Sequence, residues 1–391
     1  MSANNYLLLL LSFGHMATDI VQGAIPALLP FLKDRYALSY AVTGSLLLAA
    51  HLTSSAIQPL FGYFTDRRPF PFLLPLGCLV SGVGIALLPF SPGFRWVVAA
   101  VMFTGLGTAA FHPEGFKSTA CVVTDRRATG MSFFSVGGNL GFAVGAPAAI
   151  FLVSRYGLPG AAALLAPAAA AAALFLPALP RIRERIAAAT ARPVPAAANG
   201  PGRPLYAVSL IILIVVLRSW THLGLATYIP FLYRDELARN PGYVATLLFV
   251  FLGAGTIGTL LGGVLADRVG HRRMLFWSLA LQVPLLYLFL AATGAAVFLV
   301  AFTAGATIVS TFSVTIVMAQ ELFPRRMATA SGAIAGFAIG TAGIGVTLLG
   351  AVADRYGVPA ATHAIVALPA AGALLALLLP LPWKVPGEAA S

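Results

Sequence analysis

Long apolar stretches dominate this chain of 391 residues and restrict it to a small set of folds. A helix needs about 20 consecutive apolar residues to cross the roughly 30 Å hydrocarbon core of a bilayer. Charged residues make up 9% of the chain, against roughly 25% in soluble proteins. We therefore predict an all-α integral membrane protein. Twelve transmembrane helices are expected at residues 6–32, 41–64, 71–91, 95–120, 128–153, 158–179, 205–233, 243–266, 273–293, 295–320, 327–351 and 358–381.

The positions of the cationic residues predict the orientation of the chain. The net charge is +12. With both termini inside, 16 of the 24 Lys and Arg residues fall on the cytoplasmic side and seven on the other. Membrane proteins concentrate Lys and Arg in their cytoplasmic loops. We therefore expect both termini in the cytoplasm, and the positive charge gives no support to nucleic-acid binding.

Short motifs recur about 200 residues apart and indicate an internal duplication. Gly62-x-x-x-Asp66-Arg67 returns as Gly263-x-x-x-Asp267-Arg268, and Arg155-Tyr156-Gly157 returns as Arg355-Tyr356-Gly357. A duplication of six spans is typical of one large class of transporters. We predict a six-helix bundle at residues 1–179, a polar cytoplasmic linker at 180–204 and a second six-helix bundle at 205–391.

The repeated motif also carries a resemblance to a known family. Residues Gly263 to Arg273 read Gly-x-x-x-Asp-Arg-x-Gly-x-Arg-Arg, and the first copy departs from this pattern after Arg67. The chain resembles the major facilitator superfamily over essentially its whole length. Residues 58–77, 107–115 and 136–147 resemble its fosmidomycin-resistance branch. The resemblance implies two pseudo-symmetric bundles in the inner (cytoplasmic) membrane and export of drug in exchange for protons.

Ionisable residues inside the predicted spans are candidates for proton coupling. Asp19 and His15 lie four residues apart on one face of the first span. His112 and Glu114 flank Pro113 in the fourth. A charge in the bilayer costs about 2.5–3.5 kcal/mol on insertion scales, so such groups usually face a cavity or a partner. The resemblance places spans one and four on the central cavity, where the two pairs could face each other as a proton relay. Structural hydrogen bonding, a gate and a divalent-metal site are the alternatives.

Arg218 in the seventh span has His222 one turn beyond it. A guanidinium group binds carboxylate or phosphate through two parallel hydrogen bonds. We expect Arg218 and His222, together with Asp19 and Glu114, to bind the substrate. A counter-ion for either carboxylate, or a structural ion pair, is the alternative for Arg218. Lys117 is expected to extend toward the cytoplasmic surface.

Two further groups of residues are assigned to conformational change and to packing. The resemblance implies that the repeated Asp-Arg motifs latch neighbouring helices on the cytoplasmic side. That gating group comprises Gly62, Asp66, Arg67, Gly263, Asp267 and Arg268. Glycines four residues apart allow helices to approach closely. The packing group comprises Gly137, Gly138, Asn139, Gly141, Gly145 and Pro147.

These observations predict a secondary active transporter working by alternating access. We expect proton-coupled efflux (antiport) of a small drug-like or anionic organic molecule. An importer of a small organic anion or sugar, a divalent-metal exporter using His15, Asp19, His112 and Glu114, and a non-transporting membrane receptor are the alternatives. No nucleotide-binding loop or hydrolase triad is present, so no enzyme is expected. We expect no metal and no cofactor, with the proton gradient as energy source, and a monomer in the lipid bilayer.

Overall fold

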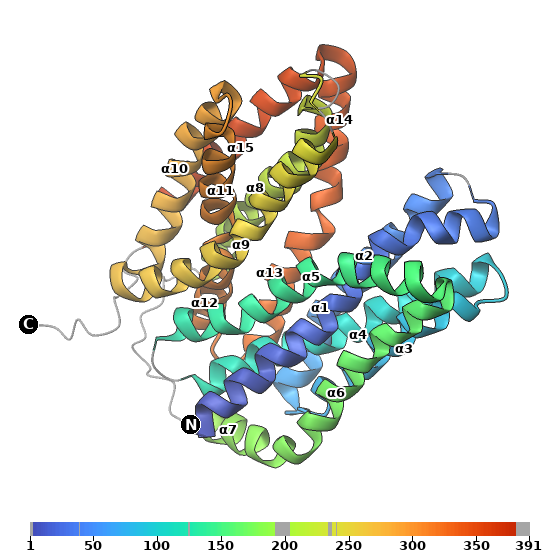
Figure 1. Ribbon diagram of the computed structural model, residues 1–391. Helices are drawn as coiled ribbons and strands as arrows, with labels where there is room; N and C mark the ends of the chain where they lie inside the picture. The colour runs from blue at the N-terminus through green and yellow to red at the C-terminus, as the bar shows by residue number, and fades with distance from the viewer. Residues whose placement is uncertain are drawn as a thin grey trace, which may run out of the picture. The chain divides into compact units, whose positions relative to one another are not determined.

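The described secondary structure is entirely helical in a computed structural model that describes residues 3–38, 40–123, 126–191, 204–233, 237–239 and 241–380 (Figure 1). Helices are the expected solution, because a bilayer offers no water to the backbone N–H and C=O groups. Eleven helical stretches in these ranges are long and apolar enough to cross a membrane. Helix α2 (Tyr40–Arg67) occupies the remaining expected span but carries polar residues such as His51 and Gln58. The predicted fold class is confirmed.

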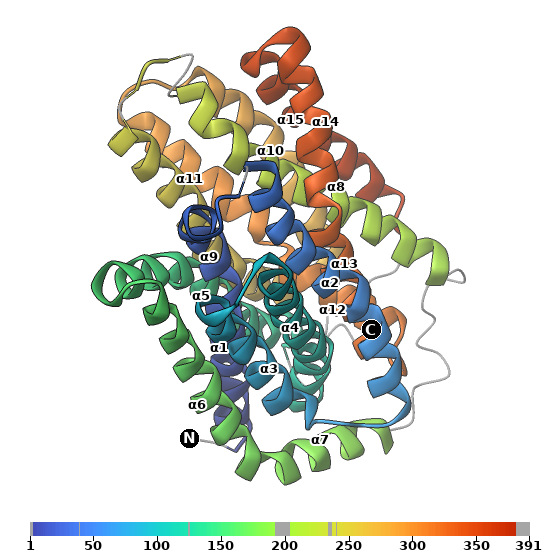
Figure 2. The same ribbon diagram turned by 90° about the vertical axis from the view of Figure 1, so that its right-hand side faces the viewer.

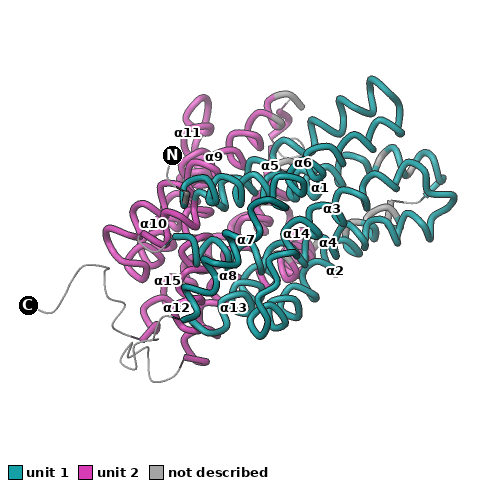
Figure 3. Tube along the Cα trace, turned by 90° about the horizontal axis from the view of Figure 1, so that it is seen from below, with its two compact units in different colours: residues 1–125, 133–194, 324–336 teal, residues 126–132, 195–323, 337–391 magenta. Residues whose placement is uncertain are grey.

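The chain divides into two compact units (Figure 3). Unit 1 comprises residues 1–125, 133–194 and 324–336, and unit 2 comprises residues 126–132, 195–323 and 337–391. The units are not continuous in sequence, because they exchange the start of α5 (Arg127–Tyr156) and the start of α13 (Met327–Gly340). The first residues of α5 belong to unit 2, and the first residues of α13 belong to unit 1.

Unit 1 contains the first ten helical elements besides its part of α13. Apart from α2 and α5 these are α1 (Ala3–Tyr36), α3 (Leu73–Leu87), η1 (Leu88–Phe90), α4 (Phe94–Val122), η2 (Leu158–Leu164), α6 (Leu165–Phe175), η3 (Leu176–Ala178) and α7 (Leu179–Ala191). Helix α7 lies in the first half of the expected polar linker. Its Ile182 and Ile186, four residues apart, are buried on one face, which explains why this segment is helical. Residues 192–203 of that linker lie outside the described residues.

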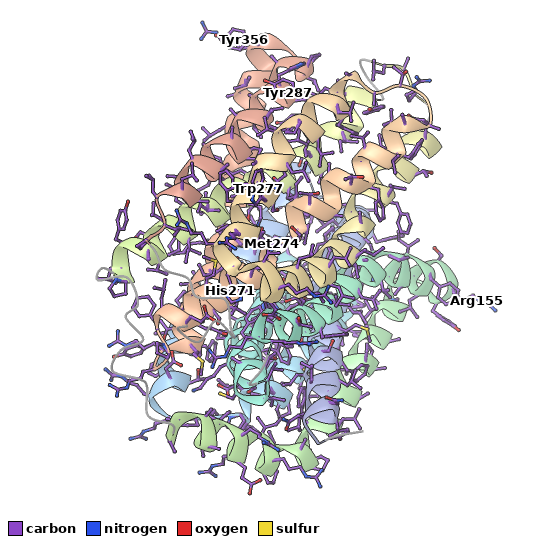
Figure 4. All side chains as sticks on the ribbon, turned by 90° about the vertical axis from the view of Figure 1, so that its left-hand side faces the viewer. Arg155, His271, Met274, Trp277, Tyr287 and Tyr356 are labelled. Carbon is purple, nitrogen blue, oxygen red and sulfur yellow. The ribbon has the colours of Figure 1, made fainter. Side chains whose placement is uncertain are left out.

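Unit 2 contains the remaining helices. These are α8 (Pro204–Phe231), α9 (Pro241–Val269), α10 (His271–Ala291), α11 (Ala296–Val309), α12 (Phe312–Leu322), α14 (Ala342–Tyr356) and α15 (Val358–Leu377). Two expected spans are each interrupted, the tenth at Ser310 and Thr311 and the eleventh at Thr341. Large apolar side chains such as Trp277 and Tyr287 are exposed on this unit, as suits a surface facing lipid (Figure 4).

The repeated Arg-Tyr-Gly motif ends equivalent helices. Gly157 follows α5 with φ +68°, and Gly357 follows α14 with φ +86°. A residue in this left-handed region closes a helix, and glycine adopts it without steric cost. Pro159 and Pro359 then lie in the first turn of the next helix in both copies. The repeated sequence motif therefore ends a helix in the same way in both halves of the chain.

Glycines of α5 lie directly on the backbone of α1. A Cβ atom at Gly137, Gly141 or Gly145 would collide with the carbonyl oxygen of Ser12, Met16 or Ile20, respectively. Both sets of residues are spaced by four, so each forms one ridge along its helix. Helix α5 therefore packs on α1 at backbone-to-backbone distance over about two turns.

This contact predicts opposite effects for the same substitution at two glycines. Gly141→Ala should lower the free energy of unfolding by about 1–3 kcal/mol, because its methyl group meets the Met16 carbonyl. Gly253→Ala in α9 has nothing within 4 Å and should be neutral or stabilising by up to about 1 kcal/mol. Unfolding in detergent micelles measures both, and equal effects at the two positions would contradict the packing described.

Candidate functional site

Three ionisable side chains from α1 and α4 meet inside unit 1. Nε2 of His15 lies 3.3 Å from Oδ2 of Asp19, and Nε2 of His112 lies 3.1 Å from Oδ1 of the same carboxylate. The side chains of both histidines are 5% exposed and that of Asp19 is 13% exposed. We call His15, Asp19 and His112 the coupling cluster. The structure therefore brings together three of the four residues expected to form a proton relay.

The walls of the coupling cluster are aromatic on one side and glycine on another. The His15 ring stacks on Phe134 of α5 at a centroid distance of 4.3 Å and lies near Phe111 and Phe116 of α4. A Cβ atom at Gly138 would come within 2.8 Å of Oδ2 of Asp19 and still closer to the His15 ring. Gly138 thus has a role beyond helix packing, because it leaves room for the ion pair.

A glutamine links the coupling cluster to a small cavity. Nε2 of Gln22, one turn beyond Asp19, donates a 2.7 Å hydrogen bond to Oδ1 of Asp19. Gln22 also lines a cavity of about 10 Å³ together with Ile25, Ala50, His51, Thr104 and Gly105. That volume is about the minimum for one water molecule. Gln22 therefore connects Asp19, through one hydrogen bond, to a space about as large as one water molecule.

The contacts of His15 place it to hold a proton against Asp19. Its Nδ1 lies 2.9 Å from the carbonyl oxygen of Phe134, which can only accept, so Nδ1 carries a hydrogen. Its Nε2 faces Asp19, and an ionised carboxylate can also only accept. An attractive contact therefore requires one more proton, either on Nε2 or on Oδ2. The His15–Asp19 geometry therefore favours one proton beyond a neutral imidazole beside a carboxylate ion.

The same three residues place their donor atoms within 4.8 Å of one another, which is close enough for a small divalent cation. Imidazole nitrogen and carboxylate oxygen are common metal ligands. The His15 Nδ1 contact to a carbonyl oxygen also resembles the outer-shell support that metal-binding histidines receive. The geometry of these three residues is thus compatible with binding either a proton or a small divalent cation.

The structure separates Glu114 from His112, against the expectation that they act as a pair. Residues two apart on a helix point about 200° from each other, so they occupy nearly opposite faces of α4. Glu114 is completely buried, and the side chains of Thr65 and Ser118 lie near its carboxylate. Its charged neighbours are Lys117 and Asp66. Glu114 therefore lies beside Lys117 and Asp66, two charged residues on α4 and at the end of α2, and its proposed role in proton coupling stays a prediction.

Lys117 is buried, contrary to the expectation that it extends to the surface. It is 5% exposed, donates a hydrogen bond to the carbonyl oxygen of Thr65, and lies 3.8 Å from Oδ1 of Asp66. The spacing of Lys117 from Glu114 indicated a shared face of α4, but nothing in the sequence indicated the acceptors on α2. Lys117 is a candidate functional residue that the sequence did not identify.

Asp66 and Asp267 cap the N-termini of two helices in the same way. Asp66 accepts hydrogen bonds from the backbone N–H groups of Ala328 and Thr329 at 3.0 and 2.8 Å, at the start of α13. Asp267 accepts equivalent bonds from Ala128 and Thr129 at 3.1 and 2.7 Å, at the start of α5. The threonine hydroxyl donates a further bond in both copies. A carboxylate is favoured here because a helix N-terminus has unpaired N–H groups and a positive dipole end.

The neighbouring glycines and arginines of the motif have different roles. A Cβ atom at Gly62 or Gly263 would collide with the backbone at Ala328 or Ala128, so these glycines allow the capped helix to approach. Arg67 lies over the ring of Tyr63 on its own helix at 4.3 Å, and Arg268 is exposed. The aspartate, and not an Asp-Arg ion pair, therefore makes each contact. We call the Asp66–α13 and Asp267–α5 contacts the two latches.

The cation beside each latch differs between the two copies. Asp66 has Lys117 nearby, whereas Asp267 has His271, whose Nε2 lies 3.7 Å from its Oδ1. Nδ1 of His271 lies 3.3 Å from Glu321 of α12, so the histidine stands between two carboxylates. Figure 4 shows His271 at the start of α10. The sequence motif did not reveal His271, although it lies four residues after Asp267.

Arg218 is a buried cation in unit 2. It is 4% exposed, and one guanidinium nitrogen lies 3.4 Å from the hydroxyl of Thr311. The guanidinium also lies 5.4 Å from the centre of the Phe312 ring. No carboxylate pairs with Arg218 in the part of the chain that the structure describes. One turn further along α8, Nε2 of His222 is buried and likewise has no hydrogen-bond partner among the described residues.

The helices and their buried ionisable clusters define a multi-pass membrane protein of the transporter type. A family model described as the Major Facilitator Superfamily matches residues 11–239 and 211–390. The chain therefore belongs to the major facilitator superfamily and is a transporter. This confirms the family inferred from the repeated Gly-x-x-x-Asp-Arg motif.

Two curated relatives cover nearly the whole chain. The uncharacterized MFS-type transporter YfnC of Bacillus subtilis is 34% identical over 384 residues, or 97% of this chain and 94% of the relative. The fosmidomycin resistance protein of Escherichia coli is 29% identical over 382 residues, or 95% and 91%. The resemblance to the fosmidomycin-resistance branch is therefore also borne out.

Two solved structures share the fold. FucP in the outward conformation has a TM-score of 0.75 at 13% identity and covers 97% of this chain and 100% of that one. The human organic anion transporter MFSD10 has a TM-score of 0.75 at 16% identity and covers 96% and 100%. At these identities the likeness concerns the fold alone.

The latch geometry predicts a difference between adjacent residues. Asp66→Ala should lower the free energy of unfolding by about 0.5–2 kcal/mol or more, because α13 loses its cap and Lys117 loses its carboxylate. Arg67→Gln, the matched control, removes only an exposed contact to Tyr63 and should change stability by less than about 0.5 kcal/mol. If the two variants unfold alike in detergent, Asp66 does not hold α13.

Proposed function

We propose that this protein is a proton-coupled exporter in which the coupling cluster carries the transported proton. The observation that supports this most directly is the 3.3 Å contact between Nε2 of His15 and Oδ2 of Asp19, a geometry suited to sharing a proton. A buried site with the geometry to hold one proton, next to a water-sized cavity, has the properties that proton coupling requires. The histidines also titrate closest to physiological pH among the ordinary side chains.

Loss of the shared proton would change the forces between α1, α4 and α5. With Nδ1 of His15 still bound to the Phe134 carbonyl, a deprotonated Nε2 would direct its lone pair at the Asp19 carboxylate. That contact becomes repulsive, so the two side chains separate or a hydrogen-bond donor enters between them. The protonated and deprotonated forms thereby favour different helix arrangements, which is the physical basis of alternating access.

The membrane potential is large enough to drive this exchange. Moving one charge across 100 mV changes the free energy by about 2.3 kcal/mol. The two conformations of a transporter typically differ by a few kcal/mol. A single proton moving through the coupling cluster would therefore shift the population of the two forms substantially.

Arg218 supports an anionic substrate. A buried guanidinium without a carboxylate partner is unfavourable unless a ligand supplies the negative charge. Thr311, which contacts Arg218, stands immediately before α12, and the positive end of that helix dipole adds to the arginine charge. His222 offers a further polar atom one turn away. We propose that an organic carboxylate, phosphate or phosphonate binds here.

The direction of transport is supported by one relative and by the charge pattern. Export is the transport direction that gives drug resistance, and the Escherichia coli relative is a fosmidomycin resistance protein. The Lys and Arg distribution supports both termini in the cytoplasm, in the inner membrane of the cell. In this arrangement protons move inward as the substrate moves outward.

The proton claim is tested by exchange in proteoliposomes that contain a pH-sensitive dye. Added fosmidomycin should change the internal pH with wild-type protein. Asp19→Asn and His15→Gln should each reduce that pH change at least about tenfold. A side chain positioned to transfer a proton typically speeds the transfer by more than that. Asn at position 19 keeps an oxygen to accept from Gln22 and His112, so the variant should fold.

Two controls make this result specific. His363→Ala removes a histidine whose side chain is exposed and bound only to its own helix, so it should exchange like the wild type. Replacing the proton gradient with a Zn²⁺ gradient tests the metal-exporter alternative at the same donor atoms. Wild-type exchange in both Asp19→Asn and His15→Gln would overturn the proposal.

The substrate claim is tested by thermal stabilisation of the purified protein. Organic carboxylates and phosphonates should stabilise it, whereas sugars and organic cations should not. Arg218→Gln should weaken anion binding roughly tenfold to a hundredfold, because hydrogen bonds to charged groups contribute about 1.5–3 kcal/mol. Arg218→Lys should lose less. Stabilisation by sugars that survives Arg218→Gln would instead support the importer alternative.

A further inference from the structure

Helix α7 carries an unusual charge cluster directly after a membrane span. Arg181, Arg183 and Arg185 alternate with Ile182 and Glu184 at the start of the helix. All three arginines and the glutamate are exposed. The preceding apolar stretch, residues 158–178, is about as long as the hydrocarbon core is thick, so we place the start of α7 where hydrocarbon gives way to lipid headgroups.

The direction of α7 keeps it at that depth. Pro177 in η3 and Pro180 in the first turn of α7 interrupt the regular helix and turn the chain. Figure 2 shows α7 running across the end of unit 1 at a steep angle to α6. The buried Ile182 and Ile186 hold it against unit 1, where it contacts α4. The helix therefore lies along the end of the unit instead of leaving the membrane surface.

The order of side chains around α7 places its arginines on both sides of the buried isoleucine pair. At about 100° per residue, Arg181 and Arg185 lie about 100° to one side of the buried isoleucine pair, and Arg183 lies about 80° to the other. Glu184 lies about 180° away, on the face opposite the protein. The three cations thus flank the buried edge, and the single anion points away from it.

The arginine charges are not neutralised by the protein. Within the described residues, none of the three makes an ion pair or a hydrogen bond through its side chain. Guanidinium groups bind phosphate through paired hydrogen bonds and keep their charge at any physiological pH. Basic amphipathic helices at a membrane surface attract anionic lipids by the same electrostatic interaction.

We propose that α7 is a binding site for anionic phospholipid headgroups, whose phosphates are held by Arg181, Arg183 and Arg185. Because the apolar edge of α7 is already buried on unit 1, the interaction is with headgroups and not by insertion into the acyl layer. The bound lipids would fix α7 against the end of unit 1, at the segment that leads from one half of the chain to the other. This site is separate from the proposed proton and substrate sites.

The test compares full-length protein in nanodiscs of phosphatidylcholine alone with nanodiscs that also contain phosphatidylglycerol. Phosphatidylglycerol should raise the unfolding temperature of the wild type. It should also be retained by the wild type in native mass spectrometry after detergent extraction. In the triple variant Arg181→Gln, Arg183→Gln, Arg185→Gln, both effects should disappear, with a loss of affinity on the order of a hundredfold.

Matched controls separate charge from helix packing. Glu184→Gln lies on the same helix and should preserve or strengthen the phosphatidylglycerol effect. The triple Arg-to-Lys variant keeps the charge and should retain most of it. High salt should diminish the phosphatidylglycerol effect in the wild type, and this test does not depend on the folding of any variant. A phosphatidylglycerol effect that persists in the triple Gln variant, or that is unchanged by salt, would overturn the proposal.

Discussion

A charged group in the apolar interior must be paired inside the protein, and this constraint organises the functional parts of the structure. Asp19 meets it with two histidines and Gln22. Asp66 and Asp267 meet it with the backbone N–H groups of α13 and α5. Arg218 has only a hydroxyl and an aromatic ring among the described residues. The pairing is therefore complete where a helix is capped and where we propose that a proton is held, and incomplete where we propose that a substrate binds.

The two copies of the internal duplication share their helix caps and close-packing glycines but differ in their buried ionisable residues. Both copies have the aspartate cap, the nearby glycine and the glycine that ends a helix at positive φ. The cation beside the cap is Lys117 in one copy and His271 in the other. The coupling cluster occurs in unit 1 and the buried arginine in unit 2. The repeat thus supplies two similar latches, while proton and substrate functions are proposed for different units.

Much of this could be predicted from the sequence, because membrane crossing imposes a strong pattern. The apolar spans, the duplication and the pairing of His15 with Asp19 follow from length, offset and helical spacing. The contact of His112 with Asp19 could not be predicted in this way. His112 and Glu114 point in nearly opposite directions from α4, and only the packing of α1 decides which of them meets Asp19. Lys117 and His271 were missed for a similar reason, since their acceptors lie on helices far away in sequence. Helix α7 was hidden by the proline, alanine and arginine content of its segment, although Ile182 and Ile186 carry the helical spacing.

The most direct test of the central claim is the protonation state of His15. Solid-state ¹⁵N NMR of protein labelled at its six histidines reports on both ring nitrogens, and His15→Gln assigns the signal. The proposal predicts that both nitrogens of His15 are protonated or strongly hydrogen-bonded near neutral pH, and that Asp19→Asn converts Nε2 to an ordinary unprotonated nitrogen. A neutral His15 with an unprotonated Nε2 beside an ionised Asp19 in the wild type would contradict it.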